Sequence, residues 1–237
     1  MNEQAKSALL EEHEVLFLDF LGFASAVQRW DDDRMRKLIS VLVNIAEAQS
    51  AFDINGQAQS GGSYKITTRP ELTTFSDNIV VSCPRPTKPA EVADDLWEVI
   101  ANNWDGMVRQ QMQNITAQVV MVGLDIGLLA RGGLSRGKLY HHGGVVVGEA
   151  MVDAYCLEKK PPGNPRVIVS DRISGNDRLY TDADGVRCLD YINAMMLLAD
   201  ERHGDARAWA QDRLAEMRTN HFPERAQAQS EVGLIQG

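Results

Sequence analysis

The sequence predicts an α+β fold in which one mixed, largely antiparallel sheet is covered by helices on one face. The order of elements favours this class, because a strand and a helix are followed by a hairpin, a helix, further strands, a helix and a strand. Residues 14–21 are apolar at nearly every position, which is typical of a central strand buried on both faces. Residues 71–84 predict two strands around a polar turn at Ser76, Asp77 and Asn78.

The other elements of the first half follow from periodicity and turn chemistry. Residues 24–52 have a helical pattern, and Asp31 to Asp33 favour a fresh helix start within it. Residues 53–63 are polar and rich in glycine, so we expect a loop. Residues 64–68 are predicted to form a short strand before the hairpin.

The second half alternates helical and β patterns. Residues 90–131 are mostly helical in pattern, and residues 132–148 form a β region interrupted by glycines. A helix is predicted over residues 149–160, because the proline-rich stretch 161–165 stops it. Residues 166–170 predict a last strand, and the remainder is helical and polar, with a frayed tail.

Composition limits the classes of function. The 237 residues carry a net charge of -9 with 44% hydrophobic residues, which indicates a globular core and argues against a nucleic-acid-binding surface. The cysteines Cys83, Cys156 and Cys188 have no close spacing, so we expect neither a disulfide framework nor a zinc site. The sequence shows no leader and no apolar run of about 18 residues. We therefore expect a cytoplasmic protein with no membrane partner.

Asp19 lies in the middle of the apolar stretch "LFLDFLGF". A buried carboxylate costs several kcal/mol unless it is paired, hydrogen-bonded or bound to a metal. Asp77, at the tip of the predicted hairpin, is a candidate partner on a neighbouring strand. Two such carboxylates can hold a pair of divalent cations about 3.5 to 4 Å apart, the arrangement that binds a triphosphate. The alternative for Asp77 is an ordinary turn residue.

Two further features have both a binding and a structural interpretation. Gly22 and Phe23 follow Asp19 at a strand-to-helix junction, where backbone N–H groups can hold phosphate oxygens, although glycine commonly ends a strand. His141 and His142 could bind a metal or act in acid–base chemistry. A polar hairpin tip is favoured for them, because adjacent side chains on a strand point to opposite faces.

The chain resembles the catalytic domain of class III nucleotide cyclases over roughly residues 14–171. The resemblance rests on the order of four stretches: "FLDFLGF", "FSDNIVVS", "ARGGLSRGKLY" and "VGEAMVDAYCLE". It implies a ferredoxin-like domain that works as a homodimer with its active sites at the interface. It also implies conversion of a nucleoside triphosphate to a 3′,5′-cyclic monophosphate and pyrophosphate.

The resemblance implies roles for residues of this sequence. Asp19 and Asp77 match the two aspartates that bind two divalent metal ions, Mn²⁺ or Mg²⁺, and the backbone carbonyl of Phe20 matches a further ligand. Gly22 and Phe23 match the segment that wraps the phosphates.

The departures from the family pattern concern the base. Adenylate cyclases have lysine, and guanylate cyclases glutamate, four residues before the second metal aspartate, where this chain has Thr73. A second base-recognising position, usually Asp or Cys, holds Val145. A purine would lose its hydrogen-bonding partners at these positions. With these substitutions, and in the stretches "RGGLSRGKLYHHGG", "DAYCLEKK" and "NPRVIVSD", the chain most resembles the bacterial pyrimidine cyclases of anti-phage signalling, the Pycsar type. UTP is favoured as substrate, with cyclic UMP as product, and a cytidylate or purine cyclase is the alternative.

A second departure concerns the transition state. The family has asparagine and arginine four and eight residues after the glycine that opens the later helix, where this chain has Val152 and Cys156. If the enzyme is active, another cation must replace the arginine, and Arg131, Arg136 and Lys159 are candidates. The alternative is a cyclase-like domain that has lost catalysis and serves for binding or dimerisation.

These inferences predict three parts of the chain. They are an N-terminal extension over 1–13, a nucleotide cyclase catalytic domain over 14–189, and a C-terminal helical extension and tail over 190–237. The predicted partner besides the second subunit is an effector protein that senses the cyclic nucleotide after it diffuses from the enzyme.

Overall fold

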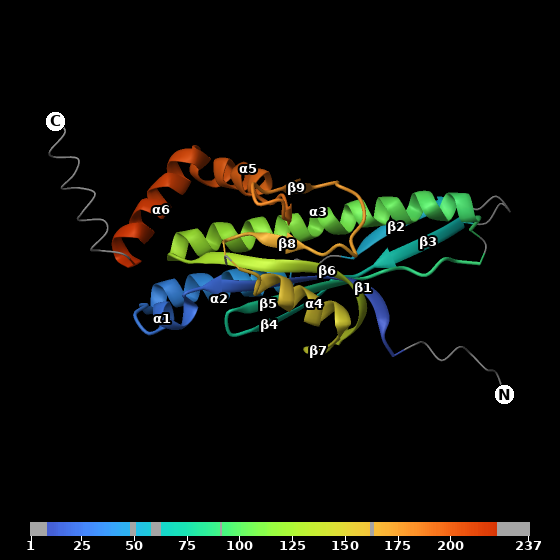
Figure 1. The fold of residues 1–237 in the computed structure, drawn as a ribbon, viewed down its shortest axis with the longest axis horizontal. Helices are drawn as coiled ribbons and strands as arrows, with labels where there is room; N and C mark the ends of the chain where they lie inside the picture. The colour runs from blue at the N-terminus through green and yellow to red at the C-terminus, as the bar shows by residue number, and fades with distance from the viewer. Residues whose placement is uncertain (1–8, 48–50, 58–62, 91, 162–163, 222–237) are drawn as a thin grey trace.

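The computed structural model describes residues 9–47, 51–57, 63–90, 92–161 and 164–221 (Figure 1). The strands are β1 (Glu11–Leu21), β2 (Phe52–Gln57), β3 (Ser63–Thr68), β4 (Glu71–Phe75), β5 (Asn78–Pro84), β6 (Leu129–His142), β7 (Val145–Gly148), β8 (Val167–Val169), β9 (Leu179–Thr181) and β10 (Arg187–Leu189). The helices are α1 (Phe23–Val27), α2 (Asp32–Glu47), α3 (Asp94–Ile126), α4 (Glu149–Glu158), α5 (Ile192–His203) and α6 (Ala206–His221).

The main sheet has eight strands, with β1 in its interior. The strand order is β4-β5-β1-β6-β8-β10-β9, and β7 pairs with β6. Only the β6–β8 pair is parallel among the described strand pairs. The predicted α+β class and largely antiparallel sheet are therefore confirmed. The strand predicted over residues 14–21 lies within β1, hydrogen-bonded on both edges by β5 and β6.

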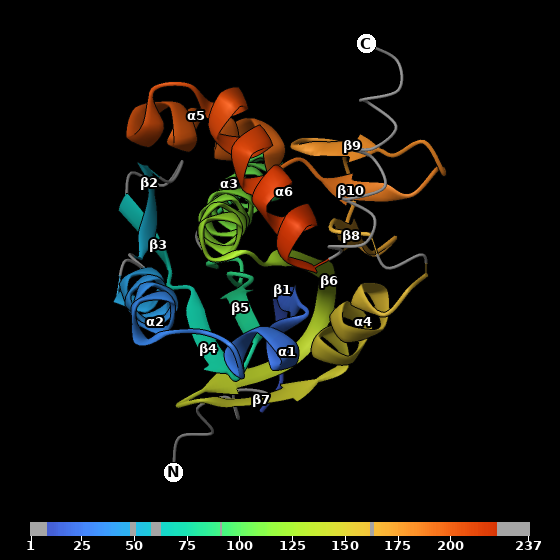
Figure 2. The same ribbon diagram turned by 90° about the vertical axis from the view of Figure 1, so that its left-hand side faces the viewer.

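Helices pack on both faces of this sheet, which corrects the expectation of helices on one face. Alternate residues of β1 separate into two apolar clusters: Leu16, Leu18 and Phe20 join the large core with α3, whereas Val15 and Phe17 join the smaller core with α4. Figure 2 shows α3 and α4 on different sides of β1 and β6. A strand buried on both faces is apolar throughout, as residues 14–21 are.

Three other boundaries differ from the sequence prediction. Residues 53–57 form part of β2, paired with β3 in a separate two-stranded sheet, and not a loop. The helix predicted over residues 90–131 ends at Ile126, where Gly127 adopts a left-handed conformation with φ of 85° before β6 begins. The short strands β9 and β10 interrupt the region predicted to be helical. The predicted tail, residues 224–237, lies outside the described residues.

Within the part of the chain that the structure describes, no helix combines the length and apolar character that a membrane crossing requires.

Candidate active site

Asp19 and Asp77 lie at the same end of the main sheet, near the end of β1 and in the β4–β5 turn. Asp19 is near the end of β1 and stands opposite Asn78 of β5, the residue after Asp77. The Phe20 N–H donates a hydrogen bond to the Asp77 carbonyl oxygen at 3.3 Å, which ties the β4–β5 turn to β1. Ser76 adopts a left-handed conformation with φ of 56° in this turn. The structure thus brings the two predicted metal-binding aspartates together.

Like charges surround the Asp19 carboxylate, whose side chain is only 14% exposed. Burial raises the pKa of Asp19, and the negative charges of Glu158 and Asp77 raise it further. The positive charges of Arg131 and Lys159 oppose these effects on the pKa. A cation bound between Asp19 and Asp77 would relieve this repulsion.

Arg131 is the protein's own cation at Asp19. It stands directly opposite Asp19 on β6, and its Nη2 lies 3.3 Å from Asp19 Oδ2. Its Nε is ion-paired more closely to Glu158, the last residue of α4, whose side chain is fully buried. Lys159 Nζ lies 3.2 Å from Glu158 Oε2. Arg131 is therefore shared between two carboxylates.

Glu158 was missed by the sequence analysis. It stands next to Lys159 and Lys160 at the end of a helix, where an acidic residue is ordinarily solvated. The carboxylate of Glu158 is buried because α4 packs against β1 and β6. No local sequence signal distinguishes it from an exposed glutamate.

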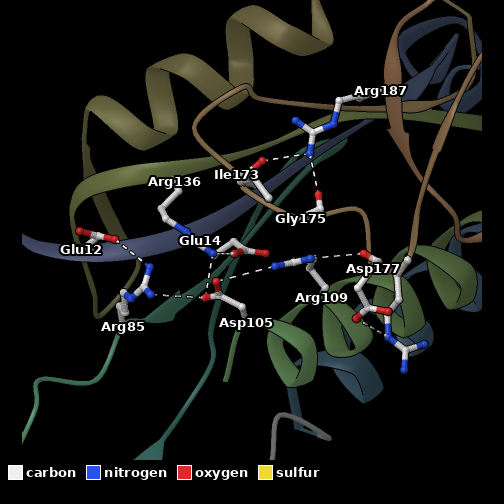
Figure 3. Close-up of polar contacts among 11 residues, drawn as sticks. Glu12, Glu14, Arg85, Asp105, Arg109, Arg136, Ile173, Gly175, Asp177 and Arg187 are labelled. Carbon is white, nitrogen blue, oxygen red and sulfur yellow. Dashed lines mark hydrogen bonds and ion pairs between the residues drawn. The ribbon is translucent and has the colours of Figure 1, made fainter. Parts of the chain in front are cut away.

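Arg136, the other arginine candidate, lies elsewhere (Figure 3). Its Nη2 contacts Glu14 Oε2 at 2.7 Å and Asp105 Oδ1 at 2.9 Å, both buried. Glu14 belongs to the α3 side of β1, because it alternates with Val15 and Phe17 on the α4 side. The structure therefore does not bring Arg136 together with Asp19, and it assigns Arg136 to a buried ion-pair network.

The predicted phosphate-binding segment forms the start of α1. Gly22 is left-handed with φ of 80°, and its carbonyl accepts the Ala26 N–H at 3.0 Å. No side chain caps this helix. The Phe23 ring packs edge-on against Trp30, so any phosphate contact from Phe23 must come from its backbone.

The two positions predicted to contact the base lie on β4 and β7. The Thr73 hydroxyl lies 2.9 Å from Nε2 of His141, whose register partner on β7 is Val146. Val145, the residue before Val146, pairs with His142 and so points to the opposite side of the hairpin from His141, where it is 53% exposed. His141 is buried and His142 is exposed, as expected for adjacent side chains that point to opposite faces of a strand at a hairpin tip.

Helix α4 follows Gly148 and carries Val152 and Cys156, the two residues that depart from the family pattern, on its exposed side. Val152 and Tyr155 are both exposed, and Cys156 is an exposed free thiol. The Tyr155 ring contacts Phe17 edge-on, and Lys159 Nζ lies 5.2 Å from the centroid of the Tyr155 ring. Tyr155 therefore lies at the margin of the smaller core.

The donors at this site suit hard divalent cations. In the described ranges, no group of three or more His, Cys, Asp and Glu side chains is placed to hold a metal ion. Mg²⁺ is typically held by one or two carboxylates, with phosphate oxygens and water completing its shell. Asp19 and Asp77, with the Phe20 carbonyl, fit that donor set.

Comparisons with known proteins give matches among solved structures. No family model matches the sequence, and no curated protein matches it. A solved structure of a bacterial light-regulated adenylyl cyclase is similar, with a TM-score of 0.43 and 11% identity over 85% of this chain. The match spans 56% of that protein's chain. An identity and a TM-score of this size assign no function.

Proposed function

We propose that this protein is a nucleotide cyclase that converts a pyrimidine nucleoside triphosphate, preferably UTP, to its 3′,5′-cyclic monophosphate and pyrophosphate. The observation that carries the proposal is the meeting of Asp19 and Asp77 where β1 and the β4–β5 turn adjoin. The family resemblance of the surrounding motifs agrees with this arrangement.

The residues of the site would bind and orient the substrate. Asp19, Asp77 and the Phe20 carbonyl would hold divalent ions, which lower the pKa of the ribose 3′-hydroxyl and neutralise the leaving pyrophosphate. Because β1 is hydrogen-bonded on both edges, Asp19 is held on a rigid strand. Arg131, 3.3 Å from Asp19, adds positive charge beside the triphosphate. The backbone at Gly22 would contact the phosphates.

Thr73 and Val145 support a pyrimidine substrate. They replace the lysine or glutamate and the aspartate or cysteine that recognise purines in the family, and a threonine hydroxyl offers one donor and can accept. The cyclic nucleotide would act as a second messenger for a separate effector protein, as in anti-phage signalling. A cytidylate or purine cyclase would give a different product in the experiment below.

Exposed apolar side chains support the proposed homodimer. Val145 and Val147 of β7, and Val152 and Tyr155 of α4, are between 45% and 59% exposed. We call these four residues the β7–α4 set. Val145 and Val147 point to the side of β7 opposite Val146, which packs with α4, so the set lies on two sides of the hairpin. Burial of these side chains against a second subunit would stabilise a dimer.

A second candidate function is a cyclase-like binding module without catalysis. It is favoured by Val152 and Cys156, whose exposed side chains on α4 offer neither the amide nor the guanidinium of the family.

One assay separates these functions. The protein is incubated with Mn²⁺ and each of the four ribonucleoside triphosphates, and products are identified by mass spectrometry. We expect cyclic UMP, with loss of at least 100-fold in Asp77→Asn, on the order expected for an essential ligand. The control Asp171→Asn, an exposed aspartate, should retain activity. If no cyclic product forms, the cyclase proposal is refuted and the binding module without catalysis is favoured. If ATP is the best substrate, the pyrimidine assignment is refuted.

A further inference from the structure

Helix α4 brings a buried carboxylate to the candidate active site. The helix packs so closely on β6 that a Cβ at Gly133 would lie 2.8 Å from Leu157 Cβ. Arg131 is two residues from Gly133 and therefore on the same face of β6. This packing places Glu158, the last residue of α4, in an ion pair with Arg131, and the Glu158 side chain is fully buried.

Arg131 is bound more closely to Glu158 than to Asp19. Its shortest ion pair is between Nε and Glu158 Oε1. Its contacts with Asp19 are 3.4 Å from Nε and 3.3 Å from Nη2, and both are with the same oxygen, Oδ2. Among the described residues, no hydrogen bond or ion pair reaches the other oxygen, Oδ1. Asp19 thus keeps one oxygen without a partner from the described part of the chain.

An arginine that pairs with one carboxylate commonly has a different geometry. Its planar guanidinium donates two parallel hydrogen bonds, one to each carboxylate oxygen, at about 2.7 to 2.9 Å. The contacts of Arg131 with Asp19 are longer and reach one oxygen. Glu158 accounts for the difference, because it binds Nε of Arg131 and is itself held by Lys159 Nζ at 3.2 Å. Glu158 therefore keeps the guanidinium to one side of the Asp19 carboxylate.

The charges around Asp19 favour a further cation. Three carboxylates, those of Asp19, Asp77 and Glu158, face two protein cations, Arg131 and Lys159, and the other four charges all act on Asp19. A fully paired Asp19 would offer a divalent cation no free oxygen. The arrangement in the structure offers it both an oxygen and an excess of negative charge.

We infer that Glu158 is a positioning residue that keeps Asp19 available to a divalent cation, by holding Arg131 where it contacts one Asp19 oxygen and leaves the other free. The inference rests on the metal-binding role proposed for Asp19 and not on the identity of the nucleotide. Without the Glu158 carboxylate, Arg131 would donate to both Asp19 oxygens and compete with the metal. A buried ion pair that adds little to stability would then have a use in the site.

Mn²⁺ binding to the full-length protein in the absence of nucleotide tests this inference. Electron paramagnetic resonance measures the free Mn²⁺, and the binding that is lost in Asp77→Asn defines the site. Glu158→Gln should weaken this binding on the order of tenfold, whereas Arg131→Gln should strengthen it on the order of threefold. Each variant is titrated at a temperature at which thermal denaturation shows it to be folded.

The matched control is Glu149→Gln. It removes the same charge from the first turn of the same helix, where the Glu149 side chain is 52% exposed and paired with Arg172. Its Kd for Mn²⁺ should stay within about twofold of the parent value, because an exposed charge is screened.

A double variant separates positioning from direct attraction. If Glu158 acts through Arg131, Glu158→Gln should weaken Mn²⁺ binding by less than about threefold when residue 131 is already changed to glutamine. An equal loss in both backgrounds would show that Glu158 attracts the cation directly, and it would overturn the inference. Unchanged Mn²⁺ binding in Glu158→Gln would also overturn it, and would assign Glu158 to stability alone.

Failure of the proposed function gives a different result. If Mn²⁺ binding follows the expected pattern but no cyclic nucleotide forms in the product assay, the cyclase proposal is refuted and the inference stands. If the parent protein shows no Mn²⁺ binding that depends on Asp77, the metal site is refuted and the inference with it.

Discussion

Asp19 illustrates how one residue of the site depends on partners that are distant in sequence. Its cation is Arg131, and the carboxylate competing for that cation is Glu158. From the sequence, Arg136 was preferred to Arg131, whose match to a family arginine suggested a structural role. They point to opposite faces of β6, but only the register, in which Arg131 stands opposite Asp19 and Arg136 opposite Glu14, shows which one reaches the site.

Replacing Arg136 tests its assignment to the buried network. Arg136→Met leaves the fully buried Glu14 without its nearest cation, so we expect a loss of about 3 kcal/mol in the free energy of unfolding. The variant should retain turnover at temperatures where it is folded. Urea denaturation and the cyclase assay measure the two effects.

The control is Arg172→Met, because Arg172 pairs with Glu149 and Asp153 at a half-exposed site. Its stability should change by less than about 1 kcal/mol. A catalytic role for Arg136 would instead appear as lost turnover without lost stability.

His13 makes stability depend on pH. Its pKa is lowered from 6.5 to about 4, mainly by burial and then by the charge of His141. The unfolded chain takes up a proton on His13 below about pH 6.5 that the folded chain does not, so this residue's contribution is complete above that pH and lost as the pH falls towards 4.

We therefore expect the urea midpoint of the protein to decrease more steeply between pH 7 and pH 4.5 than that of His13→Gln, whose side chain does not titrate. Parallel midpoints in the two proteins across this range would contradict the lowered pKa of His13.

Elements are positioned by close contacts that hydrophobic patterns do not encode. Strand β2 was expected to be a loop because its sequence is polar, and its pairing with β3 is reinforced by Asp53, which accepts from Thr67 and pairs with Lys65 at 2.9 Å. Strands β9 and β10 have three residues each, too few for a periodic signal. By contrast, β1 and α4 were predictable from long apolar runs and a proline stop.

The approach of α4 to the sheet depends on Gly133. A Cβ at this position would lie 2.8 Å from Leu157 Cβ and would meet the Ala154 carbonyl still more closely. We expect Gly133→Ala to lower the free energy of unfolding by about 2 kcal/mol, because α4 must move away from β6. Thermal denaturation measures this change.

A glycine-to-alanine substitution in α3 should instead raise the free energy of unfolding. A Cβ at Gly106 would lie 3.6 Å from Asp177 Oδ2, an ordinary contact, and alanine favours the helix. Gly106→Ala should raise the free energy of unfolding by up to about 1 kcal/mol. Equal effects of the two substitutions on the free energy of unfolding would mean that the close packing of α4 against β6 does not require glycine at position 133.

At the scale of the whole molecule, the exposed apolar side chains of the β7–α4 set support the proposed homodimer. The α+β class and the central strand were available from the sequence, but the exposure of Val145, Val147, Val152 and Tyr155 was not, because apolar residues of this kind equally predict a core.

Val152→Asp should shift the protein from dimer to monomer in analytical ultracentrifugation and abolish cyclase activity. A charge in an apolar interface is not compensated there, and each proposed active site needs the second subunit. Val99→Asp is the control, because Val99 is similarly exposed, at 55%, but lies on α3. A monomeric parent protein, or a dimeric Val152→Asp, would contradict the proposed interface.

The order of the strands along the chain also determines when each charged residue of the site is synthesised. Asp19 and Asp77 belong to β1 and to the turn before β5, which are synthesised before β6. Arg131 and Glu158 emerge later, on β6 and α4. Because chain synthesis proceeds at about 5 to 20 residues per second, the nascent chain holds two acidic groups for seconds before their cation arrives.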